Sequence, residues 1–274
     1  MAVSMADITK LRKMTGAGMM DCKNALVEAN NDFEAAVEII RKKGQAVAAK
    51  RVDREASEGC VLAAANGNFA AIFALKCETD FVAKNTDFIA LTKSILDAAI
   101  ANKPANMDEL KAMKIGDSTV EQLIVDRIGI TGEKMEAGYY EYISAPSTIA
   151  YIHPGNKLAT IVGFNQETVD TQVAKDVAMQ VAAMAPLAVT REEIPADVVA
   201  KEFEIAKDKA REEGKKEEML DKIAQGRLNK FYQEATLLEQ AFIKDAKMSI
   251  QQYLKSINKD LTATAFKRVT LNVD

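Results

Sequence analysis

GCVLAAANGNFAAIFALKC, residues 59–77, holds two apolar runs on either side of a short polar turn. The turn residues Asn66, Gly67 and Asn68 favour a tight reversal of the chain, which predicts a β-hairpin. After it, DFIALTKSILDAAIA at residues 87–101 has the apolar spacing of an amphipathic helix. This stretch therefore predicts a small antiparallel sheet covered by a helix.

The same order of elements returns later in the chain. STIAYIHPGNKLATIVGFN, residues 147–165, predicts a second hairpin, and TVDTQVAKDVAMQVAAMAP, residues 168–186, predicts a second helix. Aligning Gly67-Asn68 with Gly155-Asn156 gives an offset of 155 − 67 = 88 residues. We interpret this as an internal duplication. The match is weak residue by residue, so chance similarity stays the alternative.

The first part of the chain predicts a compact three-helix bundle. Gly16 and Gly18 end a first helix, DCKNALVEAN forms a second, and a third begins after Asp32 and is predicted to end at Gly44. A charged, alanine-rich linker follows at residues 45–59. The expected core of the bundle consists of apolar residues on its inner faces: Leu11, Ala25, Leu26, Val27, Ala35, Val37 and Ile40.

The last third of the chain predicts a pair of antiparallel helices that projects from the second half. The pair covers about residues 195–229 with its break at Gly214, and a helix and a final strand follow it. The predicted fold class is α+β, with a duplicated core of small antiparallel sheets with helices. The expected parts are residues 1–53 (helical domain and linker), 54–139 (first core half) and 140–274 (second core half with the helical pair).

Composition and motifs favour a binding protein. The net charge of −4 argues against nucleic-acid binding, which needs clustered basic residues. Cys22, Cys60 and Cys77 are far apart without a CxxC pair, and His153 is the only histidine, so neither a metal site nor a hydrolytic triad is indicated. No phosphate-binding glycine motif is present. We expect no cofactor and no catalytic residues.

Targeting signals are not evident in the sequence. No apolar run is long enough to cross a bilayer, and the start, MAVSMADITKLRKMTG, lacks the apolar segment of a signal peptide. We therefore expect a cytoplasmic protein without a membrane partner.

Two stretches are candidates for contact with another protein. In TGAGMMDCK, residues 15–23, Met19 and Met20 follow two glycines, and methionines adapt well to partner surfaces. Capping of the small core is an equally good interpretation, although the bundle is too small to bury both. In the second stretch, residues 76–85, Phe81 lies in a predicted loop. Folding back over the sheet is the simplest outcome, but the second half has a plainer connection at 165–170, which favours exposure of the ring.

Four stretches together resemble the elongation factor Ts family, the guanine-nucleotide exchange factors of elongation factor Tu. The matching motifs are LRKMTGAGMMDCKNAL (11–26), CETDFVAKN (77–85), YIHPGNKLATIV (151–162) and GRLNKFYQEATLLEQAFIKD (226–245). The resemblance covers essentially the whole chain in order. It implies a ubiquitin-associated-like N-terminal domain, a duplicated α+β core and a protruding helical hairpin, and a factor that accelerates GDP release without catalytic chemistry of its own.

The resemblance also implies roles for particular residues. The segment that dislocates Mg²⁺ from elongation factor Tu matches Thr79, Asp80, Phe81 and Val82. The resemblance also implies contact with the partner for the residues that match the family's partner-binding positions: Leu11, Met19, Met20, Lys23, Ile128, Gly129 and His153. The chain departs from the family after Ile128-Gly129, where Ile130-Thr131 stands in place of the usual residues.

Several alternatives stay open at this point. A non-catalytic adaptor and a hydrolase are the competing classes of function, and GDP release from elongation factor Tu would separate them. A homodimer, or a complex with two copies of each protein, is also compatible with the projecting hairpin.

Overall fold

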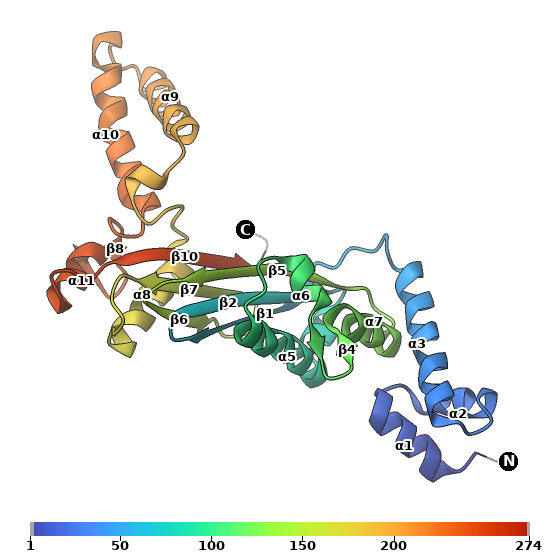
Figure 1. Ribbon diagram of the computed structural model, residues 1–274. Helices are drawn as coiled ribbons and strands as arrows, with labels where there is room; N and C mark the ends of the chain where they lie inside the picture. The colour runs from blue at the N-terminus through green and yellow to red at the C-terminus, as the bar shows by residue number, and fades with distance from the viewer. Residues whose placement is uncertain (1–2, 273–274) are drawn as a thin grey trace.

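The computed structural model describes residues 3–272, with helices at the N-terminus, two sheets in the middle and a projecting pair of helices (Figure 1). The N-terminal bundle has the three predicted helices. Ser4 and Asp32 cap the first and third through their side chains, and Gly16 ends the first with a φ of 73°. The helices are α1 (Met5–Thr15), α2 (Met19–Glu28) and α3 (Phe33–Lys50).

The core of this bundle differs from the prediction at two positions. Leu11, Ala25 and Leu26 are buried as expected. Val27 is 57% exposed and Ala35 is exposed, so both core assignments are wrong; Ala36 is the buried residue at the start of α3. The helical period explains the error at Val27, because the buried residues Cys22, Ala25 and Leu26 share one face of α2 and Val27 lies a further 100° around the helix, beyond the edge of that face.

Helix α3 does not end at Gly44, which corrects the sequence-based prediction. The helix continues to Lys50, and Gly44 is buried within it. A Cβ atom on Gly44 would lie 3.5 Å from the Cα of Gly129, in the later helix α7. Gly44 thus allows two helices to cross closely, a role that depends on a residue 85 positions away and leaves no local signal.

The first core half is a three-stranded antiparallel sheet in the order β1-β2-β5. Its strands are β1 (Glu58–Asn66), β2 (Phe69–Cys77) and β5 (Met135–Ser144). Between β2 and β5 lie α4 (Asp80–Ala83), α5 (Thr86–Asn102), α6 (Met107–Ala112), β3 (Lys114–Ile115), β4 (Ser118–Thr119) and α7 (Val120–Thr131). Strand β5 pairs with β2 through Ser144, so this half extends beyond the expected boundary at 139.

The second core half repeats this plan with the order β10-β7-β6. Its strands are β6 (Ser147–Ile152), β7 (Leu158–Phe164) and β10 (Ala263–Thr270). Between β7 and β10 lie α8 (Thr171–Met184), a 3₁₀ turn (Arg191–Glu193), α9 (Ala196–Glu212), α10 (Glu217–Ala235), β8 (Ala241–Phe242), β9 (Asp245–Ser249) and α11 (Ile250–Ile257). The predicted final helix and strand are confirmed.

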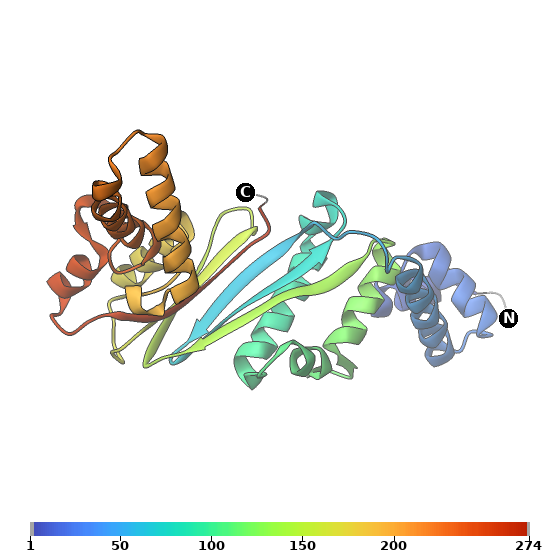
Figure 2. The ribbon, with the colours of Figure 1, turned by 90° about the horizontal axis from the view of Figure 1, so that it is seen from above.

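The two sheets pack face to face between two layers of helices (Figure 2). Along β2, Ala70, Ile72 and Ala74 face the second sheet, whereas alternate residues such as Phe73 and Leu75 face α5 and α7. On β7, Ile161 faces the first sheet, whereas the residues directly before and after it in the sequence face α8. Burying a side chain such as Phe73 contributes about 1.5–3 kcal/mol, so these layers hold the core together.

The shared topology supports the duplication, but the 88-residue offset is wrong within the strands. That offset aligns Phe73, which faces helices, with Ile161, which faces the other sheet. An error of one residue reverses the face of every side chain in a strand. The error arises because the hairpins differ in length: Asn66 pairs with Phe69, whereas Ile152 pairs with Ala159.

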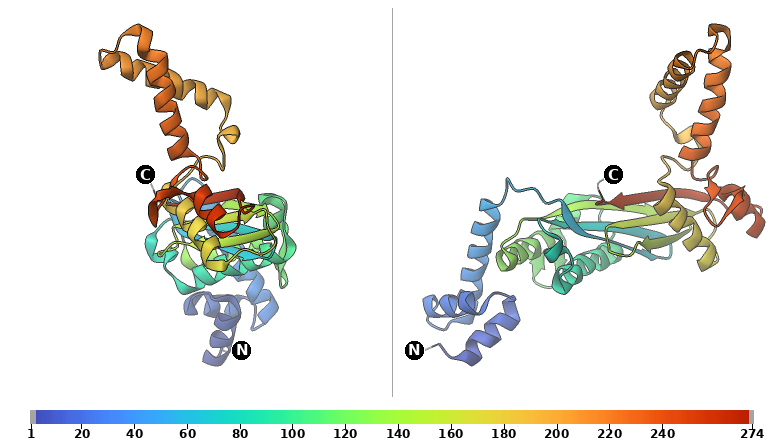
Figure 3. Two further views of the ribbon diagram at one scale, coloured as in Figure 1. Left: turned by 90° about the vertical axis from the view of Figure 1, so that its left-hand side faces the viewer. Right: turned by 180° about the vertical axis from the view of Figure 1, so that it is seen from behind.

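Helices α9 and α10 project from one end of the core, and the N-terminal bundle extends from the other (Figure 3). The chain reverses between α9 and α10 at Gly214, as predicted, and Gly214 has a φ of 75°. Arg227 pairs with Glu213 across the reversal. Helix α10 continues to Ala235, beyond the expected limit near 229. Among residues 3–272, no helix is both long enough and apolar enough to span a bilayer.

Candidate functional site

Phe81 is the most exposed large apolar side chain of the described residues, at 84% of its surface. It lies on α4, a single helical turn that we call the tip helix and that replaces the predicted loop. Thr79 begins this turn by accepting a hydrogen bond from the Val82 N–H, and Asn85 caps the next helix in the same way. The expected exposure of the ring is therefore confirmed.

The other side chains of the tip helix point elsewhere. Val82 packs against the apolar core between the first sheet and helices α5 and α7, which we call the first core cluster, and Ala83 is buried in it. Thr79 is half-buried and turns its hydroxyl towards Glu133. Of the four residues expected to act on a partner, only Phe81 presents an uncovered apolar surface.

Asp80 lies beside Phe81 and forms an ion pair with Lys84, with 2.6 Å between Oδ2 and Nζ. The hydrogen bond from Lys84 holds the pKa of Asp80 below its ordinary value, and the positive charge of Lys157 adds to the effect. Asp80 is therefore a carboxylate near neutral pH. Its charge is already shared with Lys84, which a cation or a donor on a partner would have to displace.

The turn between β6 and β7 lies close to the tip helix. The Val61 N–H on β1 donates to the Asn156 carbonyl at 2.7 Å, and the Lys157 ammonium pairs with Glu58 at the start of β1. Glu58 pairs in the sheet with Cys77, the last residue of β2 before the tip helix. His153 is exposed on this turn, and its Nδ1 lies 3.0 Å from the Tyr151 hydroxyl. The structure thus brings the two core halves together near Phe81.

The N-terminal bundle presents a second apolar surface on α2. Met20 is 63% exposed, Lys23 is exposed, and Met19 is half-buried against the bundle core, so the two methionines are not both buried. Val27 extends the surface, because positions 20, 23 and 27 follow the i, i+3, i+7 spacing of one helical face. We call Met20, Lys23 and Val27 the α2 face. Sequence reasoning missed Val27, although this spacing could have indicated it.

Three residues expected to contact a partner do not offer side chains for that purpose. Leu11 has no exposed surface and forms the centre of the bundle core. Ile128 is buried in the first core cluster, and a Cβ atom on Gly129 would lie 2.7 Å from the Cα of Gly44. Leu11 and Ile128 are core residues in this structure, and Gly129 is the point where α7 crosses α3, so their contact with a partner stays a prediction.

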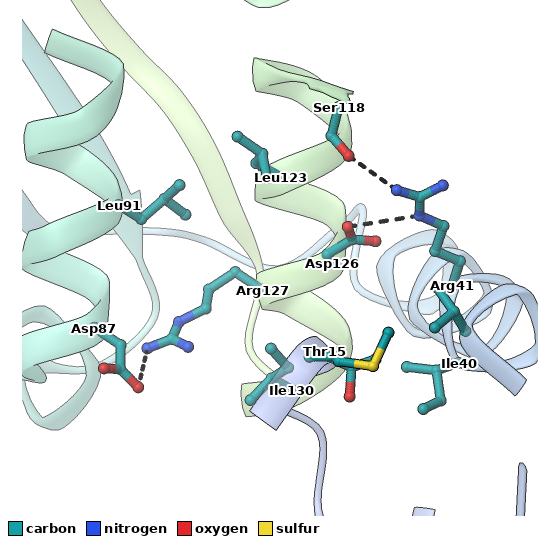
Figure 4. Close-up of a pocket in the computed structure, with 12 residues that line it drawn as sticks. Thr15, Ile40, Arg41, Asp87, Leu91, Ser118, Leu123, Asp126, Arg127 and Ile130 are labelled. Atoms are coloured by element: carbon teal, nitrogen blue, oxygen red, sulfur yellow. Dashed lines mark hydrogen bonds and ion pairs between the residues drawn. The ribbon is translucent and has the colours of Figure 1, made fainter. Parts of the chain in front are cut away.

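A junction pocket of about 330 Å³ separates the bundle from α5 and α7 beside this crossing (Figure 4). On one side, an Arg41 nitrogen donates to the Ser118 hydroxyl at 2.9 Å, and Arg41 pairs with Asp126 at 3.8 Å. On the other side, Arg127 pairs with Asp87 at 3.1 Å. The contacts of Arg41 and the glycine crossing tie α3 to the core, whereas the Arg127–Asp87 pair joins α7 to α5 within the core.

Within residues 3–272, no set of three or more His, Cys, Asp or Glu side chains is arranged around a common point that could hold an ion. The three cysteines are buried and unpaired. Burial raises the pKa of the Cys77 thiol, next to the tip helix, to about 12.

The chain is similar to known proteins over its whole length. The family profile described as Elongation factor TS matches residues 78–272. The chain is 62% identical to elongation factor Ts of Porphyromonas gingivalis and 55% identical to that of Azobacteroides pseudotrichonymphae, in each case over all of both chains. It is 46% identical to elongation factor Ts of Bacteroides thetaiotaomicron, over 331 aligned positions that span both chains.

Proposed function

The chain belongs to the elongation factor Ts family of translation factors, and from this premise we propose that it binds elongation factor Tu carrying GDP and accelerates the release of GDP. The proposal assigns the decisive step to Phe81. It requires no acid–base chemistry from this chain, because the change in the partner is one of binding and not of covalent bonds.

The observation that carries the proposal is the exposed ring on the tip helix. Phe81 is 84% exposed although its neighbours Val82 and Ala83 pack inwards. Burying such a ring against a partner contributes roughly 1.5–3 kcal/mol. If the ring fits only the partner conformation that has lost its nucleotide, this free energy shifts the partner towards that conformation.

The thermodynamic requirement is a difference in affinity between two states of the partner. A factor that binds the GDP-bound and the nucleotide-free states equally well changes nothing, however tightly it binds. By linkage, the factor by which GDP weakens binding of the chain equals the factor by which the chain weakens binding of GDP. We propose that Phe81 displaces the partner elements that hold Mg²⁺, which then weakens the hold on GDP.

The remaining exposed residues supply affinity in this proposal. The α2 face, with Met19 beside it, contacts the nucleotide-binding domain of elongation factor Tu, and His153 contacts a neighbouring surface. Asp80 adds electrostatic competition near the Mg²⁺ site once a partner group separates it from Lys84. Thr79 and Val82 hold the tip helix in place, and Leu11, Ile128 and Gly129 act only by supporting the contact surfaces.

Replacing the ring tests the proposal. We expect Phe81→Ala to lower the maximal rate of fluorescent GDP release from elongation factor Tu by roughly ten- to a hundredfold, which corresponds to loss of the burial free energy of the ring. The fold and much of the affinity should be retained, since Phe81 packs against no core cluster. Stopped-flow measurements over a range of factor concentrations separate the maximal rate from the half-saturating concentration.

Ile257→Ala on α11 is a matched control, because Ile257 is also an exposed apolar residue, at 51%. With this variant, elongation factor Tu should release GDP as fast as it does with the unmodified chain. A Phe81→Ala variant with the unmodified rate would exclude the role of the ring. If the unmodified chain itself failed to accelerate release, the adaptor alternative would be favoured.

A further inference from the structure

The tip helix is too short to hold Phe81 in place by itself. Four residues form a single turn, and isolated helices of that length are unstable in water. Its only large apolar anchor is Val82, which is partly buried against the core. The direction of the ring therefore depends on the residues at the base of the turn.

Glu133 binds the first residue of this base through both of its carboxylate oxygens. The Thr79 N–H donates to Oε2 at 3.0 Å, and the Thr79 hydroxyl donates to Oε1 at 2.6 Å. Because the hydroxyl proton points at Glu133, the lone pairs of that oxygen are free to accept from the Val82 N–H, 3.4 Å away. Glu133 thus fixes the residue that caps the tip helix.

A reciprocal contact holds the adjacent residues. The Lys134 N–H donates to the Glu78 carboxylate at 2.6 Å, and Arg51 donates to the same carboxylate at 3.0 and 3.2 Å. Glu78-Thr79 and Glu133-Lys134 therefore exchange hydrogen bonds in both directions. We call these four residues the base clamp. Two crossed contacts restrict rotation of the turn more than either contact alone.

Glu133 of the base clamp follows helix α7, which is anchored in the core. Helix α7 ends at Thr131 and is capped by Gly132, which has a φ of 75° and donates its N–H to the Ile128 carbonyl at 2.8 Å. Glu133 follows immediately. The helix is anchored by Ile128 in the core and by the crossing of Gly129 with Gly44. Glu133 is therefore held by a helix that is itself fixed on two sides.

We propose that Glu133 is the positioning residue for Phe81 in nucleotide exchange, holding the tip helix through Thr79 so that the ring meets the partner in one orientation. This inference rests on the proposed function. Its physical basis is preorganisation: a ring that is already fixed loses less conformational freedom on binding. Both carboxylate oxygens of Glu133 bond to Thr79, so the side chain is directed at the base of the tip helix.

The test compares Glu133→Ala with Glu136→Ala. Glu136 is a nearby carboxylate on β5 that pairs with Lys76 and Lys134 and does not bond to the tip helix. We expect Glu133→Ala to lower the maximal rate of GDP release roughly five- to tenfold, as for loss of charge-assisted hydrogen bonds, with little change in the half-saturating concentration. Glu136→Ala should keep both values. Equal losses in the two variants would overturn the proposal.

Combining Glu133→Ala with Phe81→Ala distinguishes a positioning role from a general loss of structure. If Glu133 acts through the ring, the double variant should be less than about twofold slower than Phe81→Ala alone, because residues that act as a unit are not additive. A full additional loss would overturn positioning. Slow release by Phe81→Ala with normal release by Glu133→Ala would overturn this inference alone, whereas normal release by Phe81→Ala would overturn the proposed function.

Variants of Thr79 keep the proposal testable if Glu133→Ala does not fold. Thr79→Val keeps the shape and the backbone N–H but removes the hydroxyl, and Thr79→Ser restores the hydroxyl. We expect Thr79→Val to lower the maximal rate roughly two- to fivefold and Thr79→Ser to recover most of it. A Thr79→Ser variant as slow as Thr79→Val would overturn the proposal, since the hydroxyl would then not be the group that matters.

Discussion

The two core halves differ in the connection between their middle strand and the following helix. Residues 78–85 connect β2 to α5, and residues 165–170 connect β7 to α8. Both connections end on a side chain that caps the next helix: Asn85 accepts from two N–H groups of α5, and Asp170 accepts from two of α8. The shorter connection packs its apolar residue, Val169, against the second core, whereas the longer one exposes Phe81.

This difference separates what the fold requires from what it does not. The second half shows that a connection without a tip helix can join the same strand and helix. Exposing the ring of Phe81 therefore adds nothing to the stability of the first half. The comparison supports the proposal that the longer connection serves an interaction outside the chain.

Exchanging the connections would test this comparison with the largest expected effect. We expect a chain in which NQETVD replaces residues 78–85 to keep its secondary structure but to lose roughly a hundredfold or more of its stimulation of GDP release, because ring and clamp are both removed. Circular dichroism and stopped-flow release of labelled GDP would measure the two properties. Retained stimulation would mean that the two connections are functionally equivalent.

The helical glycines of the two halves offer a second, smaller contrast. A methyl group on Gly129 would lie 2.7 Å from the Cα of Gly44, whereas nothing lies within 4 Å of the same position on Gly226 of α10. We expect Gly129→Ala to destabilise the contact between α3 and α7 by about 1–3 kcal/mol. Gly226→Ala should stabilise its helix by about 0.5–1 kcal/mol.

Hydrogen exchange of residues 5–50 and urea unfolding would measure these two changes. The expected pattern is faster exchange throughout the bundle in Gly129→Ala and a higher unfolding midpoint in Gly226→Ala. If Gly129→Ala left exchange in the bundle unchanged, the crossing would not hold the bundle to the core.

The smallest expected effect concerns how the stability of the two core halves depends on acidic pH. The N–H of Lys134, together with Arg51, holds the pKa of Glu78 below its ordinary value of about 4.5. A lowered carboxyl pKa contributes stability that is present above the ordinary value and is lost as the pH falls through the lowered one. In the second half, burial would raise the pKa of Asp176, but hydrogen bonds from Lys244, Gln172 and Tyr253 outweigh it and hold that pKa low.

We therefore expect Glu78→Gln to reduce the free energy of unfolding at pH 7 by on the order of 1 kcal/mol and to have a smaller effect at pH 3. Urea unfolding at the two pH values measures the difference. Asp176→Asn should show the same sign, because Asp176 titrates in the same direction. An equal effect of Glu78→Gln at both pH values would show that the ionised form of Glu78 is not what stabilises the base clamp.

Much of the fold could be predicted from local sequence patterns. Capping residues and turns located the helices of the bundle, both hairpins and the reversal at Gly214, and comparison of the two connections predicted the exposure of Phe81. Gly44 was misread because its helical conformation depends on Gly129, far along the chain. The contact of Glu133 with Thr79 was missed for the same reason, since 54 residues separate them and neither position is unusual by itself.

The candidate surface was predicted less completely than the fold. The motifs included the two exposed apolar positions Met20 and Phe81, but they did not distinguish exposed side chains from buried ones that support them. Leu11 and Ile128 belong to the second group because their faces of the helix point inwards. Val27 belongs to the first, although its apolar character suggested the core.

Helix α7 carries the bundle on its side and the base clamp at its end, which makes its length as important as its composition. A helix turns by about 100° for each residue. One residue added between Gly129 and Gly132 would leave the crossing with Gly44 in place but turn Glu133 away from Thr79. The interval between these two glycines therefore sets the rotational phase between two separate surfaces of the molecule, and an insertion or a deletion here would change that phase.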